Sequence, residues 1–330
     1  RTTNSVLLNG RHTIPTSDTQ VGALRFTSPE VDWTLSASEA GLYQPDKRIF
    51  GGAWNQAGFP GPIWIAYKPA ANFNLGNLQR IWKSIDEESQ QGSLNLKLPF
   101  EQWSESPGYM KLGVFSDRVD RAFDQDTYTN PGFFTFDGDF NDPWSAVFPS
   151  QNIPIQEATT DVDYDGEIKL DAYYAMMDLP LNSQVNLIGG VRREHNEIEV
   201  INDPDIDAQW FPPGATALQS LDPGEADVQY RQNSTLPSIG LNYEPMERLV
   251  FRANYSETVA RQTFKELTPV IQQEYLGGPI FIGEPSLEIS QLRNYDLRVD
   301  YTPYEGGFMS ASFFYKDITD PIEYVQRAFE

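Results

Sequence analysis

The chain has 330 residues, of which 24 are basic and 47 acidic, and its formal net charge is −23. An acidic balance of this size repels polyanions at long range and argues against nucleic acid as a partner. Cysteine is absent, which excludes disulfides, thiolate metal sites and a cysteine nucleophile, and His12 and His195 are the only imidazoles.

No run of about 18 apolar residues occurs, which excludes an ordinary transmembrane helix but not membrane strands of about ten alternating residues. The first residues, RTTNSVLLNG, include neither an initiating methionine nor a signal peptide. We therefore expect the N-terminus to be internal to a longer precursor or to have been processed.

The first candidate strands are residues 19–26 and 31–43, which we expect to pair as a hairpin around Ser-Pro-Glu. Residues 43–91 are rich in glycine, proline and asparagine and show no sustained period. We expect most of this segment to be a loop.

From residue 93 onward, apolar and polar residues alternate in several segments, which is the period of a strand with one apolar face and one polar face. Four hairpins are predicted, pairing residues 93–100 with 109–123, 167–179 with 185–200, 228–243 with 248–258, and 292–301 with 308–317. The apolar parity is clearest at Leu249, Phe251, Ala253 and Tyr255 and at Tyr295, Leu297, Val299 and Tyr301. The other parity carries Arg252, Asn254, Ser256, Asn294, Asp296, Arg298 and Asp300.

The connections between these hairpins are long, at residues 124–165, 201–227 and 259–290, whereas the turns within each hairpin are short. Outer-membrane barrels show this asymmetry, with tight periplasmic turns and extended outer loops. Segment 185–200 is also longer than a usual strand, as a tilted membrane strand must be. Tyrosines that fit an interfacial girdle lie near strand ends, at Tyr243, Tyr255, Tyr301 and Tyr315. The fold class indicated is all-β, an antiparallel transmembrane β-barrel.

The stretch DVDYDG begins like a calcium-binding loop, because Asp161, Asp163 and Asp165 alternate ahead of a glycine turn at Gly166. The twelfth position of such a loop, which supplies a bidentate glutamate, is Ala172 here, so the strongest ligand is absent. Two interpretations remain. We favour the acidic, solvent-exposed end of an outer loop that leads into a strand, and a weak calcium site is the alternative.

Four aromatic residues lie in the predicted outer loops, namely Trp144, Trp210, Phe140 and Phe211. Flat rings in such loops, Trp144 and Trp210 above all, could stack on a sugar face or cover a chelate. Loop aromatics also pin a loop to its neighbour, which is the simpler alternative.

Several short motifs follow one another in the second half of the chain. They comprise Tyr255, Ser256, Thr258, Ala260, Arg261, Gly283, Pro285, Leu287, Asn294, Tyr295, Asp296, Phe314, Tyr315, Lys316 and Asp317. Their order resembles the barrel of TonB-dependent outer-membrane receptors from about Gly166 to Val325, and the hairpin AYYAMMDLPL with LIGGVRREHNEIEV resembles the branch linked to carbohydrate uptake. Gln262 stands where the family usually has proline, and Glu284 where it often has asparagine.

The resemblance implies that the chain is a partial arc of a barrel of about 22 strands with long extracellular loops. We expect early barrel hairpins and a long loop in residues 1–92 and further barrel hairpins in residues 93–330, with the plug domain and the C-terminal barrel strands absent from the chain. The resemblance also implies a place in the bacterial outer membrane. The partners implied are outer-membrane lipid, the plug domain of the same full-length protein, the TonB energy-coupling system and a small nutrient ligand, and no cofactor is expected.

On the polar face, Arg192, Glu194 and Asn196 are expected to follow one another along the lumen and to contact a ligand, beside Asp171 and Tyr173 on the neighbouring strand. The alternative is that such side chains only line the water-filled lumen and contact the plug. We expect plug contacts from Arg252, Asn254, Asp296 and Arg298.

No G-x-S-x-G elbow or H-E-x-x-H pair is present and no carboxylate pair is singled out, so we expect no enzymatic activity. The function expected is active import of a nutrient, with an oligosaccharide favoured and a ferric siderophore as the variant. A soluble, calcium-dependent, β-rich carbohydrate-binding protein is the alternative from another class. It predicts that Leu249, Phe251, Leu297 and Val299 are buried against a second protein layer.

Overall fold

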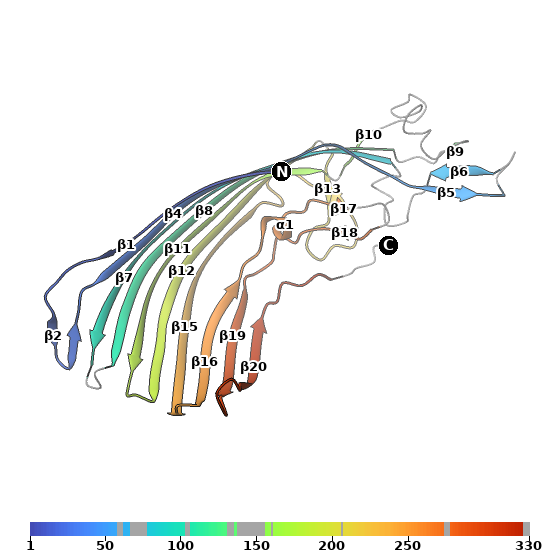
Figure 1. Ribbon diagram of the computed structural model, residues 1–330. Coiled ribbons are helices and arrows are strands. Elements are labelled where there is room, and N and C mark those ends of the chain that lie inside the picture. The colour runs from blue at the N-terminus through green and yellow to red at the C-terminus, as the bar shows by residue number, and fades with distance from the viewer. Residues whose placement is uncertain are drawn as a thin grey trace.

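The computed structural model describes residues 1–57, 62–66, 78–102, 106–130, 135–136, 156–159, 161–205, 207–273 and 278–325. Ten strands follow one another in one curved antiparallel sheet, in the order β1-β4-β7-β8-β11-β12-β15-β16-β19-β20 (Figure 1). Their bounds are Thr2–Thr13 (β1), Glu30–Phe50 (β4), Leu78–Glu101 (β7), Pro107–Asn130 (β8), Val162–Pro180 (β11), Val185–Pro204 (β12), Val228–Met246 (β15), Leu249–Ala260 (β16), Ser290–Tyr301 (β19) and Met309–Thr319 (β20). In the described chain β1 and β20 form the two free edges, so the sheet is an open arc.

Short elements decorate this arc. The short strands are Thr19–Val21 (β2), Leu24–Phe26 (β3), Gly52–Asn55 (β5), Ile63–Ala66 (β6), Thr135–Phe136 (β9), Gln156–Glu157 (β10), Gln209–Trp210 (β13), Gln219–Ser220 (β14), Gln272–Gln273 (β17) and Ile280–Phe281 (β18), and the helical turn is Phe264–Leu267 (α1). Within the described residues, no helix has the length and hydropathy of a membrane span.

The two ends of the arc differ, as the loop lengths predict. Tight turns such as residues 181–184 and 247–248 lie together at one end, whereas the long connections lie at the other, which we call the loop end (Figure 1). Helical turn α1 and strands β13, β17 and β18 sit at the loop end, on the concave side of the sheet. The predicted all-β antiparallel fold with long loops on one side is confirmed.

The convex face of the arc is apolar near the tight turns. The registers place Leu241, Ala253, Leu297 and Phe313 in one row across β15, β16, β19 and β20. Leu297 is 54% exposed and Phe313 is 64% exposed, so no second layer formed by the described residues covers this row. A soluble sandwich would bury such a face, and this exposure argues against the soluble alternative.

An aromatic row borders this apolar band on the side of the loop end. Tyr255, Tyr295 and Tyr315 stand opposite one another on β16, β19 and β20. The ring of Tyr295 lies 5.0 Å from that of Tyr255 and 6.0 Å from that of Tyr315. Amphipathic rings at this level are typical of a membrane–water interface.

Two expectations for the first ninety residues are wrong. Strand β4 pairs with β1, from Thr2 opposite Gly41 to Thr13 opposite Glu30, whereas residues 19–26 form the separate small hairpin β2–β3. Strands β4 and β7 also extend far into the segment that we expected to be a loop. Hydrophobic alternation fades there because the outward face is polar beyond the apolar band and the inward face mixes apolar and charged residues, although the backbone ladder continues.

Candidate functional site

The α1 loop, of which residues 261–273 and 278–289 are described, folds back against the concave face at the loop end (Figure 1). Phe264 and Leu267 are 3% and 1% exposed. They pack in a buried cluster with wall side chains that include Phe123, Tyr164, Ile198, Val200 and Val228. The Phe264 ring lies 6.2 Å from the Tyr164 ring, and the guanidinium carbon of Arg121 lies 5.1 Å from the centre of the Phe264 ring. These contacts hold the α1 loop against the wall.

Gly166 makes this close packing sterically possible. A Cβ atom at this position would collide with the ring of Phe264. Gly166 lies within strand β11 and does not have a positive φ. The glycine turn that belongs to the calcium-loop alternative is therefore not present at Gly166, which instead allows a close approach of the α1 loop.

Two of the three aspartates that precede Gly166, Asp161 and Asp163, bind β8 through their side chains. Asp161, 3% exposed, accepts a hydrogen bond from the Gln125 side chain at 3.0 Å and another from the Thr127 amide. Asp163 accepts one from the Gln125 amide at 2.8 Å. Asp165 stands opposite Ile201 on β12. Among the described residues, no group of three or more Asp, Glu, His or Cys side chains is arranged to hold a metal ion.

Burial raises the pKa of Asp161 from 3.8 to about 7, and the hydrogen bonds from Gln125 and Thr127 oppose this rise only in part. Asp161 lies at the loop end, beyond the roughly ten residues per strand that cross the hydrocarbon. Burial likewise raises the pKa of Asp163 to about 6.

A pH dependence of this corner follows. Because the folded pKa of Asp161 exceeds the unfolded value, the folded state holds an extra proton between about pH 4 and pH 7, and its stability falls as pH rises through this window. The loss is at most about 4 kcal/mol. We expect hydrogen-exchange protection of the Thr127 amide, corrected for the intrinsic rate, to fall over this range. The variant Asp161→Asn does not ionise at this position, so it is expected to lose the part of the slope between about pH 6 and pH 7, whereas Asp163, with a pKa of about 6, still titrates below it. An identical slope in the variant between about pH 6 and pH 7 would contradict this assignment.

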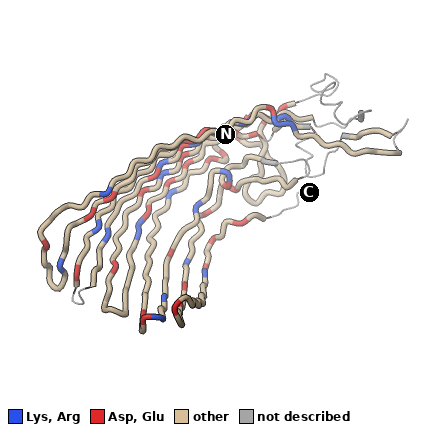
Figure 2. The backbone as a smooth tube through the Cα atoms, in the orientation of Figure 1, with Lys and Arg blue, Asp and Glu red and all other residues tan. Residues whose placement is uncertain are grey.

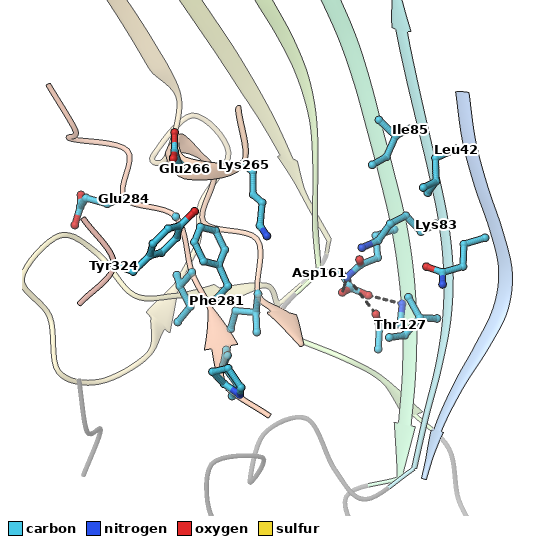
Figure 3. Close-up of a pocket in the computed structure, with 18 of the residues that line it drawn as sticks. Leu42, Lys83, Ile85, Thr127, Asp161, Lys265, Glu266, Phe281, Glu284 and Tyr324 are labelled. Carbon is cyan, nitrogen blue, oxygen red and sulfur yellow. Dashed lines mark hydrogen bonds between the residues drawn. The ribbon is translucent and has the colours of Figure 1, made fainter. Parts of the chain in front are cut away.

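A cavity of about 1220 Å³ lies between the α1 loop and strands β4, β7 and β8 (Figure 3). Lys83 and Ile85 line it from the wall, Lys265 and Phe281 from the α1 loop, and Tyr324 from the segment after β20. Figure 3 shows Lys83 and Lys265 extending into the gap from opposite sides. The sequence does not reveal this cavity, since its sides are far apart in the chain.

Three of the predicted lumenal residues lie together on the concave wall of β12. Arg192 donates to Glu194 at 2.6 Å, and Arg261 at the start of the α1 loop also donates to Glu194. Glu194 and Asn196 are 5% and 3% exposed, and neither side-chain polar atom of Asn196 has a hydrogen-bond partner among the described residues. The Glu194 carboxylate thus ties the α1 loop to the wall, a link that the sequence did not reveal.

The structure corrects the positions of Asp171 and Tyr173. Tyr173 stands opposite Arg193, not Arg192, and Asp171 stands opposite His195. Both side chains are therefore on the convex face, where Asp171 forms an ion pair with Arg118 at 2.7 Å and Tyr173 is 63% exposed. Alternate residues of a strand face opposite sides, so these two do not share a wall with the residues of β12 that face the lumen.

The two predicted loop tryptophans have different outcomes. Trp210 is 3% exposed and belongs to the buried cluster behind the α1 loop. Its ring is therefore a packing element, and its prediction as a stacking surface for a ligand is wrong. Trp144 lies outside the described residues.

The four residues predicted to face a plug lie on the concave face. Asn254 stands opposite Asp296, and Arg252 stands opposite Arg298. Asp300 accepts from Arg298 at 2.8 Å and also from Arg252. Asp300, at the same polar parity, neutralises two arginines that would otherwise repel each other across the strands.

Residues 2–329 match the family model described as TonB dependent receptor-like, beta-barrel. No curated protein matches the sequence.

Similar solved structures are outer-membrane receptors. The ferric-catecholate import receptor Fiu from E. coli K12 in its closed form shares 14% identity, with 96% of this chain and 40% of that chain covered and a TM-score of 0.49. FpvA from P. aeruginosa, in complex with a pyoverdine and iron, shares 16% identity, with 96% and 32% covered and a TM-score of 0.49. The alcaligin receptor FauA from Bordetella pertussis shares 15% identity, with 96% and 44% covered and a TM-score of 0.40. The present chain spans less than half of the length of each.

Proposed function

Since this chain belongs to the TonB-dependent receptor-like β-barrel family, whose members lie in the bacterial outer membrane, we propose that it forms part of the wall of an active transporter for a small nutrient. The observation that carries the proposal is the two-faced arc. Its convex side exposes an apolar band with an aromatic border, and its concave side is polar along the same strands. Such a sheet suits hydrocarbon on one side and a wet lumen on the other.

The family consists of transporters, not enzymes, and their transport requires an energy source. We propose that Arg252, Asn254, Asp296 and Arg298 contact a plug domain of the same full-length protein. Asn254 and Asp296 are exposed on the concave face, which supports this role. A TonB energy-coupling system would then act on the plug.

We place the ligand at the loop end, between the concave wall and the α1 loop. The cavity supports this position because it lies where long loops meet the lumen. Arg192, Glu194 and Asn196 continue the polar wall below the α1 loop and are proposed as further contacts along the path.

The ligand class separates two versions of the proposal. The acidic balance of the chain led us to favour an oligosaccharide over an anionic ferric siderophore. Lys83 and Lys265 in the cavity weaken that preference, because a cationic wall suits an anionic ligand as well.

An uptake experiment tests the function. A strain that lacks the gene for the full-length protein is compared with the complemented strain, using a radiolabelled maltodextrin and radiolabelled ferric citrate. We expect complementation to restore accumulation of one nutrient class, and a protonophore to abolish it because transport is energised. Recovery of the protein in the soluble fraction, or uptake insensitive to the protonophore, would refute the proposal.

A further inference from the structure

The loop-end cavity is lined by four basic and four acidic residues, in a chain that has 24 basic and 47 acidic residues overall. Figure 2 shows acidic and basic residues interspersed along the strands, so a local group of lysines is not expected from composition. Lys47 and Lys83 reach the cavity from the wall, and Lys265 reaches it from the α1 loop.

A β-bulge brings Lys47 to this side. Gln44 pairs with Lys83 and Lys47 pairs with Ile81, so β4 contains one residue more than β7 between these pairs. Residues three positions apart in a regular strand face opposite sides. The extra residue in the bulge changes this alternation, so Gln44 and Lys47 both point to the concave side. Asp46 in the bulge has a φ of 53°, and its carboxylate binds Arg48 and Arg80 at 2.7 Å and 2.6 Å.

Lys83 and Lys265 are held over aromatic rings rather than by carboxylates. The ammonium of Lys83 lies 5.4 Å from the centre of the Phe123 ring, and that of Lys265 lies 4.4 Å from the Phe281 ring. Neither lysine forms an ion pair with a carboxylate in the part of the chain that the structure describes. Cation–π contacts are weaker than a direct ion pair and leave the ammonium N–H groups available to an acceptor.

Two carboxylates of the cavity, those of Glu266 and Glu284, are engaged with neutral donors. The other charged lining residues are Arg1, Lys47, Asp161, Glu266, Glu284 and Glu323. Glu266 accepts from the amide and hydroxyl of Thr263 at 2.7 Å and 3.0 Å, and Glu284 accepts from the amide and hydroxyl of Ser286 at 3.1 Å and 2.7 Å. These acids stabilise turns of the α1 loop and do not neutralise the lysines.

The electrostatic surroundings of Lys83 are consistent with this picture. Burial lowers the pKa of Lys83, and the neighbouring charges of Lys47 and Lys265 lower it further, with only Asp161 acting in the opposite sense. A cation in such a place gains stability when an anion binds beside it.

We propose that the loop-end cavity binds an oxyanion of the ligand, a carboxylate or a phosphate, through the ammonium groups of Lys83 and Lys265. This inference rests on the proposed function, because it names the chemical class of the group that the same site receives. The geometry suits the purpose, since the two lysines come from opposite sides of the cavity and an oxyanion between them would bridge the α1 loop to the wall. Ligand binding would thereby secure the loop over the lumen.

The test uses the purified full-length receptor and calorimetric titration with citrate, pyrophosphate and the neutral sugar maltotriose. We expect Lys83→Gln and Lys265→Gln each to weaken binding of an anionic probe about tenfold, which corresponds to about 1.4 kcal/mol. Citrate and pyrophosphate distinguish the carboxylate from the phosphate. The conservative variant Lys83→Arg is expected to retain binding, which separates charge from packing.

Lys97→Gln is the matched control. Lys97 faces the same concave side near the tight turns, but it is paired with Glu30 at 3.3 Å, so its loss should leave anion affinity unchanged. Heat-modifiable mobility on gels shows that each variant is folded. Three outcomes overturn the inference: no binding of either anion at millimolar concentration, equal affinity in wild type and both cavity variants, or an equal loss in Lys97→Gln. Energised uptake that is insensitive to the cavity lysines would remove this inference alone, whereas absence of energised uptake would remove the proposed function.

Discussion

Replacing Phe264 by alanine is expected to release the α1 loop from the wall and to lower the free energy of its local opening by about 3–5 kcal/mol, the usual cost of removing a buried phenylalanine. The ring is 3% exposed and fills the space above Gly166, against Tyr164 and Arg121. The wall cannot collapse into the vacated space because its strands are fixed by the ladder on both sides. The substitution is therefore expected to leave a cavity that the surrounding side chains fill only in part.

Hydrogen exchange of the full-length receptor measures this effect. The amide of Thr268, which donates to the Phe264 carbonyl at 3.0 Å, should lose protection in Phe264→Ala. Phe313→Ala is the matched control, because Phe313 is 64% exposed on the convex face and far from the α1 loop in sequence and on the sheet. Unchanged protection of Thr268 in Phe264→Ala would show that other contacts dock the loop.

Replacing Leu297 by arginine is expected to destabilise the membrane-embedded barrel by about 1–2 kcal/mol, between the cost of a cation at the bilayer midplane and its cost at the interface. Leu297 is 54% exposed in the apolar band, one row from the aromatic border, with Ala253 and Phe313 on either side. No carboxylate shares this row of the band, so the guanidinium would have to remain in hydrocarbon or distort the bilayer. Urea-induced unfolding in phospholipid vesicles measures the difference.

The control for this prediction is Asn254→Arg. Asn254 is exposed on the concave face, one residue from Ala253 and opposite Asp296. An arginine there meets water and a carboxylate at the same depth of the barrel, and a change of less than about 1 kcal/mol is expected. Equal destabilisation by the two substitutions would show that the convex face is not the lipid face.

The period-two pattern predicted the faces of β15, β16, β19 and β20, because hydrocarbon on one side and water on the other constrain every side chain within the band. The same reasoning failed for β4 and β7 beyond the band. There, outward residues such as Ser84, Asp86 and Glu88 are polar, and the inward residues mix Ile85 with Lys83 and Glu87, so the strand shows no sustained hydrophobic period.

The misplacement of Asp171 and Tyr173 has a related cause. Their parity is that of Ala175 and Met177, whose apolar side chains belong to the convex band. Extending that parity along β11 would have placed both residues outward, in spite of their polar character. Polarity reports the face only at the depth where one side is hydrocarbon.

The sequence by itself determined the antiparallel hairpins, the two-faced strands, the short turns on one side and the family, because these depend on neighbours in the chain and on the solvent that each face meets. Tertiary structure alone decided which distant segments touch: Phe264 above Gly166, Arg261 on Glu194, and Lys265 across from Lys83. Each of these contacts joins a long loop to a wall formed by other strands. The curvature of the sheet brings them together, and no local pattern of residues encodes that distance.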